Sequence, residues 1–418
     1  RVDAKQQPSL VGQKSHDRPL KPYQVADIQP AAEGVIIAIE DNSKIVQLWL
    51  GGLPPQVLEA YGSSALLIVD TLERPLLQIF ERNGLVAKAR SLTESPSLQI
   101  GQRVRENIRT FPRDIKLAVA IDAAMNRIER VDAVSALSSV PRVSVAIAGE
   151  QAADYLFSKV EETTQVAALN PDAMKGTISP AGYGLFSQGH SAIPTTAGES
   201  GEAIKLAVRR LAPQLQTLLG AKLLSLTTNS TTSQLAIRAC LEVANFNVAV
   251  QQTNQFPSDA FELISSDGKL LSFPVGSPMR LQIDNRDAET IYFLILGLNN
   301  QGSGVMLNPI KDEQPQTSIA ANETLVLPQA PTGWTMQAPA GLSEIYLICS
   351  RIPFRQAQAL LGSGTEFIRS LPNFFEISQA VLQDLQQASG TSAWINAPDL
   401  FALNVNAWTT FRFLYQVS

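Results

Sequence analysis

Hydrophobic and polar positions alternate over short distances between Gly34 and Ile100, and polar turn residues such as Asn83-Gly84 separate the apolar runs. A period of two, with Asn, Asp and Gly between the runs, is typical of strands joined by tight turns. Five short strands at this close spacing predict a small antiparallel barrel. The predicted strands are Val35–Glu40, Ile45–Leu50, Ala65–Val69, Leu76–Phe80 and Leu85–Ala89.

The pattern becomes mixed between residues 101 and 230, where strand-length apolar runs occupy 115–121, 143–148 and 155–160. Between the first two runs, Met125, Ile128, Val131 and Leu137 recur at roughly helical spacing. That spacing predicts a helix over Ala123–Leu137.

A longer helix is predicted over Glu199–Leu226, because its apolar positions form one stripe while Lys205, Arg209 and Arg210 lie elsewhere. Pro213 lies inside this pattern, so we expect a kink or two abutting helices. The stripe consists of Ile204, Val208, Leu211, Leu215, Leu218 and Leu223.

The last third of the chain returns to strand patterns. Met279, Leu281 and Ile283 alternate with Arg280 and Gln282, which is typical of a half-buried strand. With the Gly- and Pro-containing turns between the runs, this pattern predicts a β-sandwich of the immunoglobulin-like kind. The predicted strands are Leu235–Val243, Met279–Ile283, Ile291–Leu298, Glu323–Leu327 and Leu342–Cys349, with helices at Arg355–Leu361 and Phe374–Ala388 and a final strand at Trp408–Val417.

These patterns divide the 418 residues into several domains of an α+β protein. Residues 1–29, with three prolines and no period, predict a linker or tail. We expect the barrel at 30–100, a mixed α/β domain with the kinked helix at 101–230, and the sandwich with its helices and terminal strand at 231–418.

Composition narrows the range of partners. The chain is 45% hydrophobic and 17% charged, which is typical of a folded protein. A net charge of -5, without any basic run interleaved with aromatics, argues against nucleic acid as a partner.

The longest apolar run, Ile291–Leu298, is far shorter than the ~20 residues of a transmembrane helix. The chain begins at Arg1 without Met, so we expect a fragment or a processed piece, and the compartment stays open.

Side chains for covalent or acid–base catalysis are scarce, with only two histidines and two cysteines. His190, in Ser187-Gln188-Gly189-His190, resembles the catalytic histidine turn of caspase-like proteases, and Cys240 follows it. Cys240 lacks an acidic residue two positions earlier and lies within an alternating strand, so we predict a buried structural thiol. His16 lies in the tail, and pairing of Cys240 with Cys349 stays open.

The other candidate motifs also favour structural roles, so no catalytic, cofactor-binding or metal-binding residue is predicted. Gly302-Ser303-Gly304 and Gly362-Ser363-Gly364 lack the Lys-Ser/Thr of a phosphate loop and indicate turns. Glu161-Glu162 and Asp312-Glu313 have no histidine or second acidic cluster nearby, which favours a solvated surface. We expect the scattered tryptophans Trp49, Trp334, Trp394 and Trp408 to anchor cores, and the basic side of the long helix to be solvated.

Several stretches together resemble the C-terminal region of cyanobacterial caspase-like proteins, the orthocaspase relatives of metacaspases. The final third is similar to the β-sandwich domain of unknown function that often follows bacterial caspase-like domains. The stretches outside that third are Gln7–Ser15, Val46–Pro54, Leu58–Gly62, Arg127–Ala133 and Gly149–Phe157. Those within it are Pro274–Ser277, Asp284-Asn285, Tyr292–Gly297 and Pro339–Leu342.

The resemblance implies an upstream caspase-type peptidase domain as the partner, with its catalytic His and Cys before Arg1 and protein substrates cut after Arg or Lys. Some relatives have replaced that catalytic pair, so an inactive parent is equally compatible. This chain is then a noncatalytic accessory or regulatory module. The alternatives are a stand-alone envelope or ligand-binding scaffold, or a true His190–Cys240 dyad.

Overall fold

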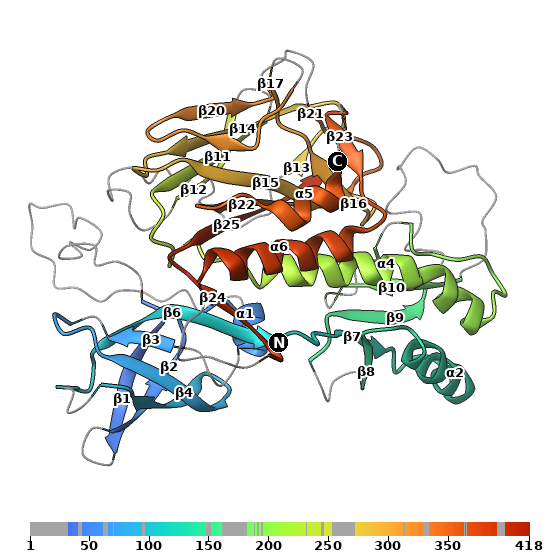
Figure 1. Cartoon of the computed structure of the whole chain (residues 1–418). Coiled ribbons are helices and arrows are strands. Elements are labelled where there is room, and N and C mark those ends of the chain that lie inside the picture. The colour runs from blue at the N-terminus through green and yellow to red at the C-terminus, as the bar shows by residue number, and fades with distance from the viewer. Residues whose placement is uncertain are drawn as a thin grey trace, which may run out of the picture. The chain divides into compact units, whose positions relative to one another are not determined.

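The computed structural model describes an α+β protein built from several sheets and helices (Figure 1). This confirms the fold class that the sequence predicts. The described residues are 32–40, 44–61, 66–69, 71–93, 97–147, 152–160, 182–187, 189, 192–193, 195–230, 232–243, 246–252, 272–311, 314–328, 334–362, 364, 366–390 and 398–418. The predicted tail at 1–29 lies outside them.

The first five strands lie where the alternating pattern predicts them, but a sixth strand closes the barrel. The hydrogen-bonded order is β1-β2-β5-β4-β3-β6, and β6 returns to β1, where Gly34 is opposite Val104. The sixth strand begins at Arg103, past residue 100, where the sequence places the end of the barrel. The strands are β1 (Gly34–Glu40), β2 (Ile45–Trp49), β3 (Leu66–Val69), β4 (Leu76–Asn83), β5 (Val86–Ser91) and β6 (Arg103–Pro112), with helix α1 (Pro55–Ala60) between β2 and β3.

A four-stranded sheet of order β10-β9-β7-β8 follows the barrel. Strands β8 and β9 run parallel to β7, and β10 is antiparallel to β9. Helix α2 (Arg127–Ser138) connects β7 to β8. The strands are β7 (Leu117–Ile121), β8 (Val143–Ile147), β9 (Tyr155–Lys159) and β10 (Tyr183–Phe186).

Helix α2 differs in two ways from its prediction. It begins at Arg127 rather than Ala123, because Asn126 and Glu129 form a reciprocal capping box that fixes the start. The predicted apolar stripe is also partly wrong, since Ile128 is 76% and Val131 is 61% exposed. The buried face is formed by Ala133, Ala136 and Leu137 instead.

The last third contains two packed sheets, as expected of a β-sandwich. One sheet has the order β12-β11-β14-β20, and the other has the order β13-β25-β22-β15-β16-β23. Strands β17 and β18 pair only with each other, and β24 belongs to the sheet of the barrel strands. The strands of the last third are β11 (Ile237–Val243), β12 (Phe246–Gln252), β13 (Ser272–Phe273), β14 (Pro278–Asn285), β15 (Ile291–Leu298), β16 (Gly304–Leu307), β17 (Ile310–Lys311), β18 (Gln314–Pro315), β19 (Ser318–Ile319), β20 (Thr324–Leu327), β21 (Trp334–Thr335), β22 (Gly341–Ser350), β23 (Ile368–Ser370), β24 (Leu400–Asn404) and β25 (Trp408–Val417).

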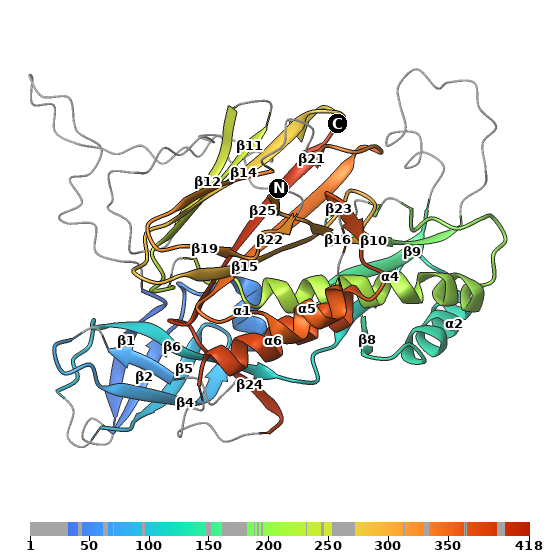
Figure 2. The same cartoon turned by 45° about the horizontal axis from the view of Figure 1, so that its top comes forward.

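Three helices lie against the outer face of the second sandwich sheet (Figure 2). Helix α4 (Ile204–Ser225) is continuous through Pro213, so the expected alternative of two abutting helices is wrong. Helices α5 (Arg355–Leu361) and α6 (Phe374–Ala388) match their predicted bounds.

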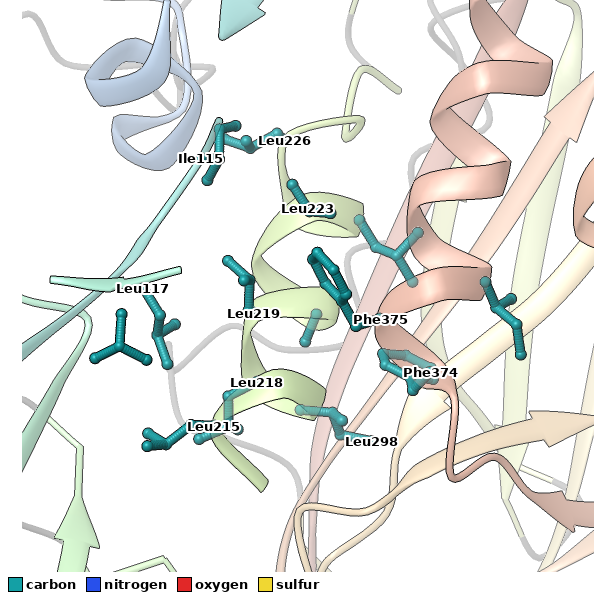
Figure 3. Packing of buried hydrophobic residues seen from close by; sticks show 14 of the residues in the cluster. Ile115, Leu117, Leu215, Leu218, Leu219, Leu223, Leu226, Leu298, Phe374 and Phe375 are labelled. Carbon is teal, nitrogen blue, oxygen red and sulfur yellow. The ribbon is translucent and has the colours of Figure 1, made fainter. Parts of the chain in front are cut away.

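Helix α4 is the centre of the largest hydrophobic core, which we call the shared core. Leu215 and Leu219 of α4 lie towards Leu117 of β7, while Phe374 and Phe375 of α6 lie on its other side (Figure 3). The same core includes Leu294, Tyr346 and Ile348 from the sandwich. The α/β sheet, the helices and the sandwich therefore share one apolar interior.

Strand β24 connects the last part of the chain to the first. It pairs with the second half of β6, where Phe401 is opposite Phe111, and both rings belong to the shared core. The barrel's own core is a separate cluster inside β1–β6. Among the described residues, no helix is long and apolar enough to cross a membrane.

Candidate functional site

The two residues of the caspase-like dyad cannot be compared in space, because His190 lies outside the described residues, as does His16. Cys240 is a buried, free thiol on β11. Burial and the nearby Glu242 raise the pKa of Cys240 to about 11, although Arg238 opposes this effect. The thiol is therefore protonated at neutral pH, which is unfavourable for a nucleophile. Cys349 is also free and fully buried, and burial raises its pKa.

The glycine motifs belong to turns. Gly302 has φ 70° in the β15–β16 turn, where the side chain of Asn299 accepts hydrogen bonds from the backbone of Gln301 and Ser303. Gly362, with φ 63°, is the C-cap of α5, as expected.

The acidic pairs Glu161-Glu162 and Asp312-Glu313 lie outside the described residues. Within the described part of the chain, no cluster of His, Cys, Asp and Glu is suited to a metal ion. The geometry therefore offers no support there for a metal site.

The tryptophans divide between buried and exposed positions. Trp334 and Trp408 are fully buried, as expected of core anchors, but Trp49 on β2 is 45% exposed, and Trp394 lies outside the described residues. On the basic side of α4, Arg210 forms an ion pair with Glu202 and donates to the backbone oxygens of Thr196 and Tyr183. Arg210 thus connects α4 to the segments around Tyr183 and Thr196, whereas the sequence predicts a solvated helix face.

The strongest candidate site is a cavity of about 650 Å³ that opens beside the C-terminal half of α4, and we call it the junction cavity. Helix α1 of the barrel lies beside that end of α4 in both views (Figures 1 and 2). The volume lies within the usual range of small-molecule sites, ~300–1,000 Å³. The cavity is lined from the barrel, the α/β sheet, α4 and the sandwich, by Pro55, Gln56, Glu59, Ala60, Tyr61, Pro112, Ile115, Lys116, Asp154, Tyr155, Ala221, Lys222, Ser225, Glu344, Tyr346 and Arg412.

One wall of the junction cavity is a polar cluster on β22 and β25. Tyr346 lies opposite Arg412 in the antiparallel ladder, and Glu344 lies two residues away on the same face. A single oxygen of Glu344, Oε1, accepts hydrogen bonds from the Tyr346 hydroxyl and from Arg412 Nε. Burial and this carboxylate raise the pKa of Tyr346, so its hydroxyl stays protonated and remains a donor.

A second part of the cavity lining holds an ion pair between α4 and the loop before β9. Lys222 Nζ lies 2.7 Å from Asp154 Oδ2 and also donates to the backbone oxygen of Lys116. The same Asp154 oxygen accepts from the backbone nitrogen of Ala118 at 2.7 Å. These bonds fix both charged groups at the cavity surface, where each side chain keeps roughly a quarter of its exposure.

Tyr155, the first residue of β9, also lines the junction cavity. Burial raises the pKa of Tyr155, and the neighbouring carboxylates of Glu344 and Asp154 raise it further. A neutral phenol is therefore held next to two carboxylates. Desolvated groups with shifted pKa values gather at functional sites more often than elsewhere, which supports this cavity as the site.

A buried polar joint also connects the barrel to the end of α4. Arg109 of β6 donates to both oxygens of Glu106, at 2.8 and 2.6 Å, and to the backbone oxygens of Leu226 and Thr228. These carbonyls follow the last turn of α4 and would otherwise lack partners. The carboxylate of Glu33 accepts from the backbone nitrogen of Glu106 at 2.6 Å. We call Glu33, Glu106 and Arg109 the polar joint.

Ionisation within the polar joint is unusual. Burial, with the negative charge of Glu106, raises the pKa of Glu33 to about 8. Tyr61, which lines the junction cavity, also has its pKa raised by burial and by Glu106. Tyr61 belongs to the barrel core and lines the cavity, so the joint interacts electrostatically with the cavity lining.

The junction cavity was missed at the sequence level because its charged residues come from distant parts of the chain. Glu344 and Arg412 are 68 positions apart, as are Asp154 and Lys222. No local motif marks them. The cavity lining combines paired charged side chains with the phenol groups of three tyrosines and the aliphatic hydroxyl of Ser225. This combination suits reversible binding of a polar ligand.

Comparison with known families identifies one segment of the chain. Residues 272–353 match the model of a domain of unknown function, DUF4384. This domain is known in some bacterial caspase-like proteins. The match covers well under half of the chain, and no curated protein and no solved structure matches the sequence.

The DUF4384 segment runs from β13 to the end of β22, so it spans both sandwich sheets. A domain of unknown function thus occurs within the third of the chain where the resemblance places one, and the four stretches that carry the resemblance there lie within 272–353. One of them has a clear structural role, since buried Asn285 donates to the backbone oxygens of Glu289, Ile319 and Ala320. The segment also contributes Glu344 and Tyr346 to the junction cavity.

Proposed function

We propose that this chain is a noncatalytic accessory or regulatory module of a bacterial caspase-like cysteine endopeptidase, of the Arg/Lys-specific class or an inactive relative of it. The observation that carries this proposal is the DUF4384 segment at 272–353, because that domain is known in some bacterial caspase-like proteins. The more specific placement among orthocaspases rests on the resemblance of the remaining stretches.

The arrangement of the module favours a role in binding. The shared core joins the α/β sheet, α4, α6 and the sandwich, and the polar joint ties the barrel to the same helix. These contacts hold the barrel, the α/β sheet and the sandwich in one compact unit. The two thiols, Cys240 and Cys349, are buried and protonated at neutral pH, so neither favours a nucleophilic role.

The outer face of α2 is the surface best suited to contact a peptidase domain. Its exposed apolar residues Ile128, Val131 and Val134 follow one another at intervals of three, so they form one stripe on the helix. Ile147 of β8, which packs beside α2, is also exposed. Contiguous exposed apolar side chains of this kind are typical of protein interaction sites.

The test is to coexpress the caspase-type domain of the parent gene with this chain, and to measure complex formation and the cleavage of Arg- and Lys-containing peptides. We expect association together with a change in rate or specificity. The Ile128→Glu/Val131→Glu double variant is expected to weaken association at least tenfold. Leu360→Glu is the matched control, because Leu360 is an exposed apolar residue on another helix, α5.

Identical cleavage with and without the chain, and no detectable complex, would remove this proposal. If the complex forms but the α2 variant binds as well as the control, the module role stands and the α2 surface is wrong.

The second candidate function is a stand-alone ligand-binding scaffold, and the junction cavity is the observation that favours it. The gene sequence upstream of Arg1 separates the two functions. An open reading frame that starts close to Arg1, with its own signal peptide, favours the scaffold, whereas a caspase-type domain in the same frame favours the accessory module.

A further inference from the structure

The junction cavity holds carboxylate oxygens that still have acceptor capacity. The hydrogen bonds to Glu344 go to Oε1, and those to Asp154 go to Oδ2. No described residue donates a hydrogen bond to Glu344 Oε2 or Asp154 Oδ1. An ionised carboxylate accepts up to about four hydrogen bonds, so the second oxygens are open to a donor from a ligand. Tyr155, which also lines the cavity, interacts electrostatically with both carboxylates.

The cavity is lined by as many basic side chains as acidic ones. Lys116, Lys222 and Arg412 balance Glu59, Asp154 and Glu344 among the lining residues. Lys116 is the cation with the weakest tie, because its nearest carboxylate, Asp114, is 3.9 Å away and the lysine side chain is 54% exposed. A ligand with a single charge would therefore meet both attraction and repulsion, whereas a ligand with both charges is complementary.

The geometry points to a zwitterionic ligand of the amino-acid or short-peptide type, whose cationic group lies against Asp154 and Glu344 and whose carboxylate lies against Lys116. The cavity volume of about 650 Å³ accommodates a short peptide rather than a macromolecule. Tyr155 and Ile115 supply apolar surface for the body of the ligand. This inference does not depend on the proposed accessory role, because it uses only the cavity.

Binding is tested by calorimetric titration of the whole chain with three forms of tetra-alanine. One has free ends, the second is N-acetylated and keeps only the carboxylate, and the third is a C-terminal amide and keeps only the ammonium. We expect the free-ended peptide to bind, and each capped form to bind at least tenfold more weakly. Low ionic strength is required, because salt screens the contacts at the cavity mouth.

Two variants assign the ends of the peptide. In the Lys116→Met variant, the advantage of the free-ended peptide over the amide is expected to disappear, while its advantage over the N-acetyl form remains. In the Asp154→Asn variant the reverse is expected, because the amide keeps the hydrogen bond from Ala118 but removes the charge. Lys88→Met and Glu81→Gln are the matched controls, since this pair lies on the barrel strands and does not line the cavity.

Thermal unfolding of each variant checks its fold, and Lys116→Met remains a valid test if Asp154→Asn fails to fold. The inference is overturned if no form of the peptide binds at millimolar concentration, or if the amide binds as tightly as the free-ended peptide. It is also overturned if the control variants shift the affinities as much as the cavity variants do. None of these results depends on whether a peptidase domain binds the chain.

Discussion

The barrel and the sandwich are attached to helix α4 by contacts of opposite character. The sandwich joins α4 through a mainly apolar interior, in which Leu296 and Ile348 belong to the same cluster as Leu219, with one hydrogen bond from the Tyr346 hydroxyl to α4. The barrel reaches the end of the helix through a buried guanidinium, Arg109, which binds two carbonyls and one carboxylate. An apolar contact is tolerant of direction, whereas a charged contact is specific in geometry and costly when one partner is missing.

The largest effect should come from breaking the polar joint. Arg109→Met keeps much of the side-chain volume but leaves Glu106 buried without its cation, and leaves the carbonyls of Leu226 and Thr228 without a donor. We expect a loss of about 3–5 kcal/mol in the free energy of unfolding. Urea unfolding followed by circular dichroism measures it, with Arg90→Met as control, because Arg90 is exposed and its side chain bonds only to Gln78 in the described chain. Equal stability of the two variants would show that the joint contributes nothing.

The second effect concerns the pH dependence of the same joint. The pKa of Glu33 is about 8 in the folded chain, against 4.5 for an ordinary glutamate. The folded state therefore holds a proton that the unfolded state releases between these values, so this stabilising contribution is complete below pH 4.5, falls as the pH rises, and is lost above about pH 8. The Glu106 carboxylate and the Arg109 guanidinium face this group.

Glu33→Gln removes that proton equilibrium but keeps an oxygen acceptor for the backbone nitrogen of Glu106. We expect the native chain to lose a few kcal/mol relative to this variant between pH 5 and pH 8. Chemical denaturation at several pH values measures the difference. A constant difference across this range would mean that Glu33 ionises normally. Glu81→Gln, at an exposed position, is the control.

The smallest effect tests the apolar packing of helix α6 on strand β16 of the sandwich. Gly304 of β16 lies beneath Phe374, and a Cβ at this position would lie 2.5 Å from three atoms of that buried side chain. Gly304→Ala is therefore expected to cost about 1–3 kcal/mol, because the ring or the strand must move. In a Phe374→Leu background the cost should be smaller, and a double-mutant cycle in urea measures this coupling. Additive losses would show that the ring and the glycine do not interact.

The elements with strong local signals were predictable from the sequence. Helices α5 and α6 and strands β15 and β25 have the predicted bounds, because a helical period or a strand-length apolar run marks each of them in the sequence. Where local pattern and tertiary contact disagree, the prediction failed. Ile128 and Val131 have helical spacing but point outward, since Ala133 and Ala136 allow α2 to approach the sheet more closely.

The candidate site was beyond prediction for a different reason. Its residues come from segments whose sequence neighbours do not signal each other, and an ion pair such as Asp154–Lys222 exists only after β9 and α4 have docked. Trp49 was misjudged for another reason, because the alternation along β2 places it on the outer face with Gln47, whereas its residue type alone favoured a core position. Periodicity reports which face of an element is apolar, but it does not report what lies against that face.

The pairing of β24 with β6 has a consequence for synthesis. Asn107 and Asn406, 299 positions apart, share a side-chain hydrogen bond next to this pairing. On the ribosome the first half of β6 can close the barrel early, but the second half has no strand beside it until residues 400–404 emerge. A nascent chain interrupted before that point exposes an open strand edge that carries Phe111, which invites pairing with other chains. We therefore expect the yield of folded protein to depend on rapid completion or chaperone protection of this edge.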